Sequence, residues 1–222
     1  MTLASFFGAY GPSVVAFAVF GLLHSVAAHE PFKEWLGHLT APFFVEHFWR
    51  ITYCALSFWA LYYAVASLHW ERNIENDVWL VAYPAWLWQA MTLAHLGSVA
   101  LMYAAFLQSD YLEFLGFTQA WRGMRALAGR PAPRLELFGT DRLVVSGVYR
   151  WMRHPMLTAG LAFLLISGPS LNNLVYTAMY AAYMIIGAYY EERRMIRLFG
   201  DDYLAYKRRV GAFFPRLWRG AR

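Results

Sequence analysis

The sequence alternates between long apolar stretches and shorter polar segments, a pattern that predicts a chain built from membrane-crossing helices. Five apolar stretches are candidates to cross a bilayer, which takes roughly 20 residues, although the fourth is short for a full crossing. They lie at residues 13–28, 48–68, 79–107, 155–167 and 171–190, and the first is just long enough when counted from Tyr10. The fourth reaches only about 20 Å, so we expect its start to lie inside the membrane boundary or its hairpin to stop short of the far side. We therefore predict an all-α integral membrane protein with about five transmembrane helices.

The fourth and fifth stretches are separated only by Gly168-Pro169-Ser170, which favours a tight reversal because Gly and Pro break helices. The two stretches then form a short helical hairpin whose outer ends return to the same membrane face. Arg153 and His154 precede the hairpin, and Glu191 and Glu192 follow it. We expect these four side chains to meet in one inward-facing cavity.

The polar segments between the apolar stretches predict further structural elements. Residues 31–39 place Phe32, Trp35 and Leu36 on one helical face, which suits a helix lying on the membrane surface. Pro84 is expected to kink the start of the third stretch, and residues 135–150 to form short extended pieces with turns at Gly139 and Gly147. The tail predicts amphipathic cytoplasmic surface helices, over 195–199 and 203–210, broken at Gly200.

Composition and charge strengthen the membrane interpretation. The chain is 59% hydrophobic and 15% charged, whereas soluble domains carry about 25% charged residues. Basic residues outnumber acidic ones in residues 109–153 and in the tail from 191, while residues 70–78 are acidic. The positive-inside rule then places the basic segments in the cytoplasm and the N-terminus outside. We expect a multi-pass protein of the cell inner membrane, in contact with the lipid bilayer and with no nucleic-acid partner.

Several other classes are disfavoured. One cysteine, Cys54, permits neither a disulfide nor a cysteine-based metal site within the chain. No basic region precedes the first apolar stretch, so we expect no cleavable signal peptide. There is no Gly-rich dinucleotide fingerprint and no Walker motif, so any nucleotide must be held by the helices themselves. We expect one membrane domain over residues 1–222, with a three-helix part at 1–108.

Arg153-His154-Pro155 is the first candidate site. Pro155 suits the first turn of a helix, whose free N–H groups and dipole favour an anion such as a carboxylate or phosphate. Arg153 could add a bidentate grip. The alternative is that these basic residues only mark the cytoplasmic end of a membrane span.

Glu191-Glu192 is the second candidate site. Carboxylates near the end of a membrane helix oppose its dipole, so a cation is expected beside them. Arg153, neighbouring arginines or a positively charged ligand would serve. The alternative is an exposed salt-bridge cluster at the membrane surface.

The histidines inside the apolar stretches allow a different interpretation of the function, as haem binding. His24 and His95 could ligate a haem, although hydrogen bonds between helices are the commoner role of such residues. His29, His38 and His47 are nine residues apart, which is not a ligand spacing for zinc. We therefore predict no metal site.

The motifs taken together, over residues 139–217, resemble the intramembrane S-adenosylmethionine-dependent methyltransferases. The shared pattern is G-x-Y-R-x-x-R-H-P, then about 35 to 40 residues, then E-E and F-G-x-x-Y-x-x-Y-[K/R]; in this chain Glu191 follows His154 by 37 positions. The group includes isoprenylcysteine carboxyl methyltransferase, phospholipid methyltransferase, methanethiol S-methyltransferase and the NnrU-like proteins. Leu157 departs from the pattern, because members of the group often have Tyr there.

The resemblance implies a methyltransferase-like, cofactor-binding core at 139–217 that uses S-adenosylmethionine and releases S-adenosylhomocysteine. Its cofactor-binding residues would be Gly147, Tyr149, Arg153, His154, Pro155, Glu191 and Glu192, with Arg153, His154 and Glu192 also catalytic. The acceptor would be a small thiol or a lipophilic molecule, reached from the membrane, with the cofactor site facing the cytoplasm. The alternative is an NnrU-like or haem-binding membrane protein of respiratory metabolism without methyl transfer.

Overall fold

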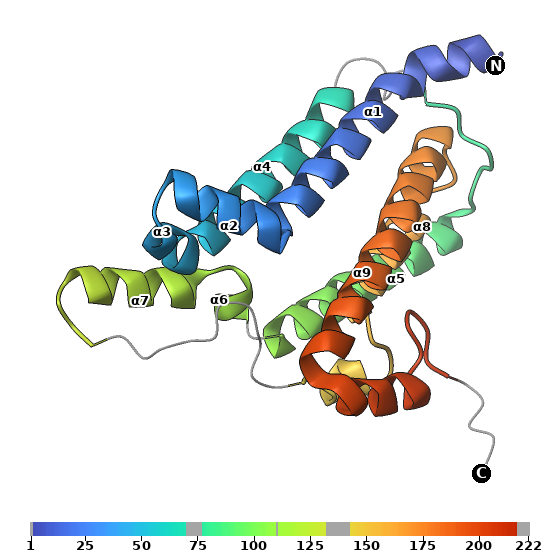
Figure 1. The fold of residues 1–222 in the computed structure, drawn as a ribbon. Helices are drawn as coiled ribbons and strands as arrows, with labels where there is room; N and C mark the ends of the chain where they lie inside the picture. Colours follow the sequence, from blue (N-terminus) through green and yellow to red (C-terminus); the bar gives the residue numbers. More distant parts are fainter. Residues whose placement is uncertain (1, 70–76, 110, 132–142, 217–222) are drawn as a thin grey trace. The chain divides into compact units, whose positions relative to one another are not determined.

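The computed structural model describes residues 2–69, 77–109, 111–131 and 143–216 (Figure 1). Helices dominate these residues, and the β-pairing seen among them consists of isolated bridges. The chain divides into two compact units, one formed by residues 1–76 and 110–138 and the other by residues 77–109 and 139–222. The all-helical fold class is therefore confirmed for the described residues.

The first unit is organised around two long apolar helices. Its elements are α1 (Leu3–Ala28), α2 (Glu30–Leu39), α3 (Pro42–His47), α4 (Trp49–His69), α6 (Tyr111–Phe114) and α7 (Phe117–Leu127). α1 packs along α4, and His24 joins them because its ring nitrogens lie 2.7 Å from the Tyr53 hydroxyl and 3.1 Å from the Ser57 hydroxyl. Trp49 adds a hydrogen bond from its indole N–H to the Ala27 carbonyl, 3.2 Å away.

The second unit holds α5 (Ala85–Gln108), the 3-10 helix η1 (Gly147–Arg150), α8 (Pro155–Ile166) and α9 (Leu171–Arg209). α8 packs against both α5 and α9. His95 on α5 lies 3.0 Å from the Phe163 carbonyl and 3.1 Å from the Ser167 hydroxyl, both on the α8 side. The two intramembrane histidines that could have ligated haem thus each make hydrogen bonds between helices.

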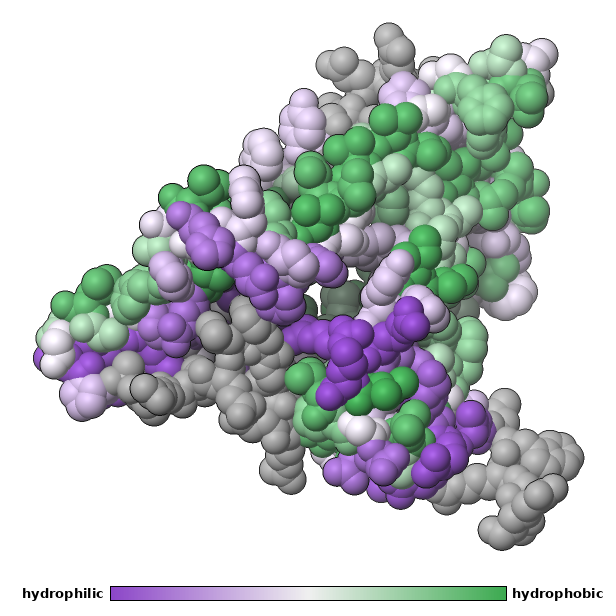
Figure 2. All heavy atoms as spheres, viewed as in Figure 1, coloured by the Kyte–Doolittle hydropathy of each residue, from purple (hydrophilic) through white to green (hydrophobic). Residues whose placement is uncertain are grey.

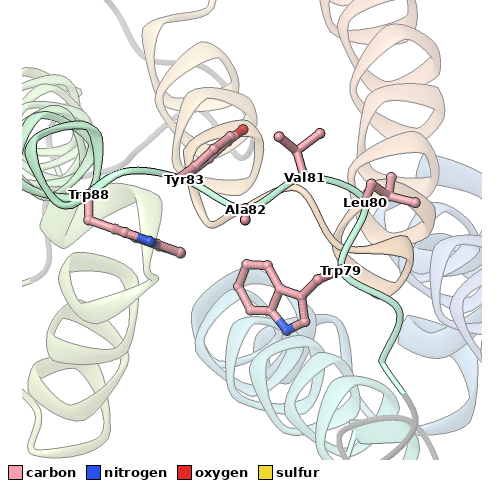
Figure 3. A pocket seen from close by; sticks show the side chains of 6 residues that line it. All are labelled: Trp79, Leu80, Val81, Ala82, Tyr83 and Trp88. Atoms are coloured by element: carbon pink, nitrogen blue, oxygen red, sulfur yellow. The ribbon is translucent and has the colours of Figure 1, made fainter.

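The chain reverses between α8 and α9 at Gly168, where φ is +124°. Ser170 caps α9 by accepting a hydrogen bond from the Asn173 amide, and Asp77 accepts one from the Asn172 amide, both 3.1 Å long. Residues 78–80 run beside this turn, with backbone hydrogen bonds of 2.8 and 2.9 Å to Pro169 and Leu171. An adjoining hollow has a volume of about 380 Å³. Figure 3 shows the side chains that line it, which are those of Trp79, Leu80, Val81, Ala82, Tyr83 and Trp88.

Element boundaries differ from the sequence prediction at several points. α5 begins at Ala85 because Pro84 caps it, and the residues before Pro84 bond to the α8–α9 turn instead. α9 continues past Tyr190 as one helix as far as Gly200, so residues 195–199 are not a separate surface helix. The predicted break at Gly200 is present, with φ 52° and ψ −126°. Residues 147–150 are a 3-10 turn rather than an extended piece, and Gly139 lies outside the described residues.

Two of the described helices, α1 and α5, are long and apolar enough to cross a membrane, and α8 is a shorter apolar helix. Few side chains of α1 and α5 are buried inside the protein, whereas the core helix of a soluble protein would be mostly buried. Figure 2 shows hydrophobic residues along α1 and hydrophilic residues gathered around the lower part of α9. These features indicate a membrane protein; five crossings remain a prediction.

Close contact between α8 and α9 at Gly160 gives a direct test of this packing. A methyl group at Gly160 would lie 2.8 Å from the Tyr180 ring carbon that carries the hydroxyl, whereas one at Gly187 on α9 meets nothing within 4 Å. Ala normally stabilises a helix interior over Gly by about 0.5–1 kcal/mol. We expect Gly187→Ala to raise the thermal stability of the purified protein slightly. Gly160→Ala should lower stability by about 1–3 kcal/mol because it overpacks the interface; equal effects of the two would contradict the packing described.

Candidate active site

A cluster of charged side chains joins the start of α8, the middle of α9 and the end of α9. Arg153 donates to Glu192 from Nε over 2.7 Å and also from Nη2. Lys207 Nζ lies 2.6 Å from the other oxygen of the same carboxylate. The side chains of Arg153 and Glu192 are only 7% and 12% exposed. Two cations therefore converge on one buried carboxylate.

Local backbone structure explains why Arg153 and His154 are held so firmly. Their amide groups donate to the carbonyls of Gly211 and Ala212 at 2.9–3.1 Å, and Arg153 Nη1 donates to the Val210 carbonyl. Pro155 then begins α8 at the one helical position where a missing N–H costs nothing. The segment after α9 thus lies against the entrance to α8.

His154 lies between the two glutamates. Its Nδ1 is 3.3 Å from Glu191 Oε2, its Nε2 is 3.3 Å from Glu192 Oε1, and the residue is 5% exposed. The Phe213 ring covers it, with ring centroids 5.6 Å apart. A neutral imidazole donates from only one nitrogen, so the ring donates to both carboxylates only when it carries a second proton.

The two glutamates differ in environment. Burial alone would raise the pKa of the Glu192 carboxyl, but hydrogen bonds from Lys207 and Arg153 outweigh it and lower that pKa. Glu192 is therefore ionised at neutral pH and a poor proton acceptor. The Glu191 side chain is 57% exposed, so its carboxylate faces solvent while one oxygen contacts His154.

Gly147 and Tyr149 lie beside this cluster and bond mainly to neighbouring helices. Gly147 has φ +57°, and a side chain there would overlap Gln108, whose amide oxygen accepts from the Val148 N–H over 3.1 Å. The Tyr149 hydroxyl donates to the Ala105 carbonyl over 3.3 Å. Burial, with a smaller contribution from the Glu191 charge, raises the pKa of Tyr149 to about 12. Tyr149 is thus protonated at neutral pH.

The structure brings Arg153, His154, Glu191 and Glu192 together, as the hairpin prediction required, with Pro155 buried beside them. These side chains contact one another directly, and the hollow of Figure 3 lies by the α8–α9 turn, at the other end of α8. Whether these residues bind a cofactor stays a prediction.

Lys207, Tyr203 and Tyr206 were not predicted as site residues, although they form the Y-x-x-Y-K part of the shared pattern. Tyr203 is 2% exposed, and burial followed by the Glu192 charge raises its pKa. The Tyr206 hydroxyl donates to the Tyr149 carbonyl over 2.5 Å. The position of the pattern in the tail was the available signal, but only the bend at Gly200 brings these residues back to α8.

Replacing the two glutamates one at a time should show that the buried Glu192 stabilises the fold and that the exposed Glu191 contributes little to stability. Glu192→Gln leaves Arg153 buried without its counter-charge, so we expect a loss of stability on the order of 3 kcal/mol. Glu191→Gln should cost less than about 1 kcal/mol, because Glu191 is more than half exposed. Thermal or denaturant unfolding in detergent measures both; a larger loss for Glu191→Gln would refute the arrangement.

The lowered pKa of Glu192 predicts a pH dependence with a definite sign. The stability that the ionised carboxylate contributes is complete above the ordinary value of 4.5 and is lost as the pH falls through the lowered pKa. The stability difference between the wild type and Glu192→Gln should therefore be constant from pH 7 to about 5 and shrink below 4.5. A difference that grows on acidification would contradict this.

Several curated proteins are similar to this chain over most of its length. A protein named methanethiol S-methyltransferase from Mycobacterium tuberculosis is 29% identical over 91% of this chain and 77% of its own. Proteins of that name from Pseudomonas deceptionensis and Bradyrhizobium diazoefficiens are 30% and 27% identical, over 93% of this chain and over 72% and 66% of their own lengths.

No solved structure gave a significant match to the chain. The family model described as NnrU protein matches residues 14–216, which include most of both units and the whole charged cluster. The match covers far more than half of the sequence and agrees with the resemblance seen in its motifs. The chain belongs to the NnrU family.

Proposed function

We propose that this protein is an intramembrane methyltransferase that moves a methyl group from S-adenosylmethionine to a small thiol or lipophilic acceptor. The observation that carries the proposal is the cluster of Arg153, His154, Glu191, Glu192 and Lys207 beside apolar helices. The names of the similar proteins support the same reaction class. The similarity to proteins named for methanethiol favours a thiol among the acceptors.

The donor set fits the proposed cofactor, which carries a carboxylate, an amino group and a sulfonium. The Lys207 side chain is 41% exposed and suits the carboxylate, together with the free N–H groups of the first turn of α8. The exposed carboxylate of Glu191 suits the cationic groups. Arg153 and Glu192, both buried, fix the positions of these partners. S-adenosylmethionine would supply an electrophilic methyl group to the acceptor.

The residues of the chain contribute orientation and proton transfer. Holding two reactants in line can lower a barrier by about 7–11 kcal/mol at best. A thiol acceptor must also lose its proton, and His154 is the better acceptor because the lowered pKa of Glu192 makes that carboxylate a weak base. Tyr149, with its raised pKa, stays protonated and serves as a hydrogen-bond donor.

The proposed setting is the cell inner membrane, with five crossings and the charged cluster on the cytoplasmic side. The apolar faces of α1 and α5 suit entry of an acceptor that dissolves in lipid. Membership of the NnrU family also fits the alternative of a membrane protein of respiratory metabolism without methyl transfer. The hydrogen bonds of His24 and His95 disfavour a haem held by these two residues.

Calorimetry and methyl transfer with the purified protein test the proposal. We expect S-adenosylhomocysteine to bind the wild type, and Glu191→Gln to weaken binding about tenfold, or about 1.4 kcal/mol. Glu34→Gln, an exposed carboxylate on α2, is the matched control and should bind like the wild type. His154→Ala should lower transfer of radiolabelled methyl to methanethiol on the order of 100-fold. Absence of binding to the wild type, or equal binding by Glu191→Gln, would overturn the proposal.

A further inference from the structure

One side of α7 is built for close packing within the first unit. Ala120 is buried, and a methyl group added to Gly123 would lie 2.6 Å from His47 Cβ and 2.9 Å from the Phe48 ring. Gly116, with φ +89°, caps the helix beside Ile51 on α4. Small residues therefore let α7 approach α3 and the start of α4 closely.

An adjoining face of α7 carries an exposed apolar stripe. Phe117, Trp121 and Met124 are spaced four and three residues apart, which places them on one helical face. They are 50%, 59% and 50% exposed. Three large apolar side chains in a row, on a helix packed against the protein along an adjoining face, indicate a surface that meets another apolar phase.

The charges on α7 indicate that this apolar phase is a membrane. α7 contains Arg122 and Arg125 and no acidic residue, and Arg130 follows soon after its end. A helix with an aromatic-rich apolar face and arginines on its other sides is typical of one lying in a membrane interface. Arginines at that depth attract the phosphates of anionic lipids.

The position of α7 in its unit agrees with this. It packs against α3 and the first turns of α4, and the neighbouring α6 is tied to α4 by a hydrogen bond of 2.8 Å from Arg50 Nε to the Phe114 carbonyl. Figure 1 shows α7 running across this end of the α1–α4 pair rather than extending it. Large apolar side chains on α1 and α4, including Leu22 and Trp59, are exposed as expected in lipid. The membrane surface would then lie at the end where α7 packs.

We propose that α7 is an in-plane anchor whose Phe117–Trp121–Met124 stripe inserts into the boundary between headgroups and acyl chains of a leaflet containing anionic phospholipid. Arg125 and Arg130 bind the lipid phosphates. This goes beyond methyl transfer, and it requires only that α1 and α4 lie in the membrane. Coverage of the stripe by another part of the chain or by a second copy is a separate outcome of the test.

Spin labels in the full-length protein test the anchor, because the single Cys54 can be replaced by Ala to give a background free of other thiols. Labels at Trp121→Cys and Met124→Cys report on the stripe, and either suffices if the other fails to fold. A label at Ala126→Cys, on the opposite side of the same helix, is the matched control. In lipid nanodiscs we expect the stripe labels to collide with oxygen at least threefold more, relative to a water-soluble nickel chelate, than the control label does.

A second experiment varies the charge of the lipid. Adding phosphatidylglycerol to phosphatidylcholine should deepen the label at residue 121, and Arg125→Gln with Arg130→Gln should abolish that response. Stripe labels as open to nickel as the control would overturn the proposal. Stripe labels that collide with neither oxygen nor the nickel chelate would also overturn the proposal, because protein would then cover the stripe. In that case, spin–spin broadening that disappears on dilution with unlabelled protein would show that the covering protein is a second copy of the chain.

Discussion

The structure around the candidate site depends on the buried ion pair between Arg153 and Glu192. A buried charge is stable only when its partners satisfy it, and here the carboxylate accepts hydrogen bonds from Arg153, Lys207 and His154. The guanidinium also donates to backbone carbonyls of residues 207 and 210. One interaction thus ties the entrance of α8, the middle of α9 and the segment after α9 into one rigid corner.

The residues of this corner differ in burial and pairing, and therefore in the role that each can have. Arg153 and Glu192 are paired with each other, so we propose that they orient the site rather than make the main contacts of an incoming molecule. Glu191 and Lys207, each exposed over 40% or more of the side chain, present opposite charges at its rim. The proposed zwitterionic cofactor would require such a pair of opposite charges, with the buried Arg153–Glu192 pair holding Glu191 and Lys207 in position.

The meeting of Arg153 and His154 with Glu191 and Glu192 could be predicted from the sequence, because a Gly-Pro turn between two apolar stretches returns the chain to its starting face. Other features depend on contacts between distant segments. Pro84 ends a segment that bonds to Pro169 and Leu171, so the start of α5 is set by a turn over eighty residues away in sequence.

The contact of Lys207 with Glu192 and the packing of α7 could not be predicted from the sequence either. Lys207 reaches Glu192 only because Gly200 adopts a backbone conformation open to few other residues, which folds the end of α9 back. The eleven residues of α7 lie in a basic segment whose charge dominated the prediction, and its packing side is defined by Gly123 against His47. Composition alone does not show such close approaches.

An experimental structure of the protein bound to S-adenosylhomocysteine tests the central claim most directly. We expect the ligand to lie beside His154, with the amino group of its homocysteine part within hydrogen-bonding distance of Glu191 and the carboxylate of that part near Lys207. The Arg153–Glu192 pair should remain unbroken. A ligand bound elsewhere, such as the hollow between Trp79 and Trp88, or one that replaces Glu192 as the partner of Arg153, would contradict it.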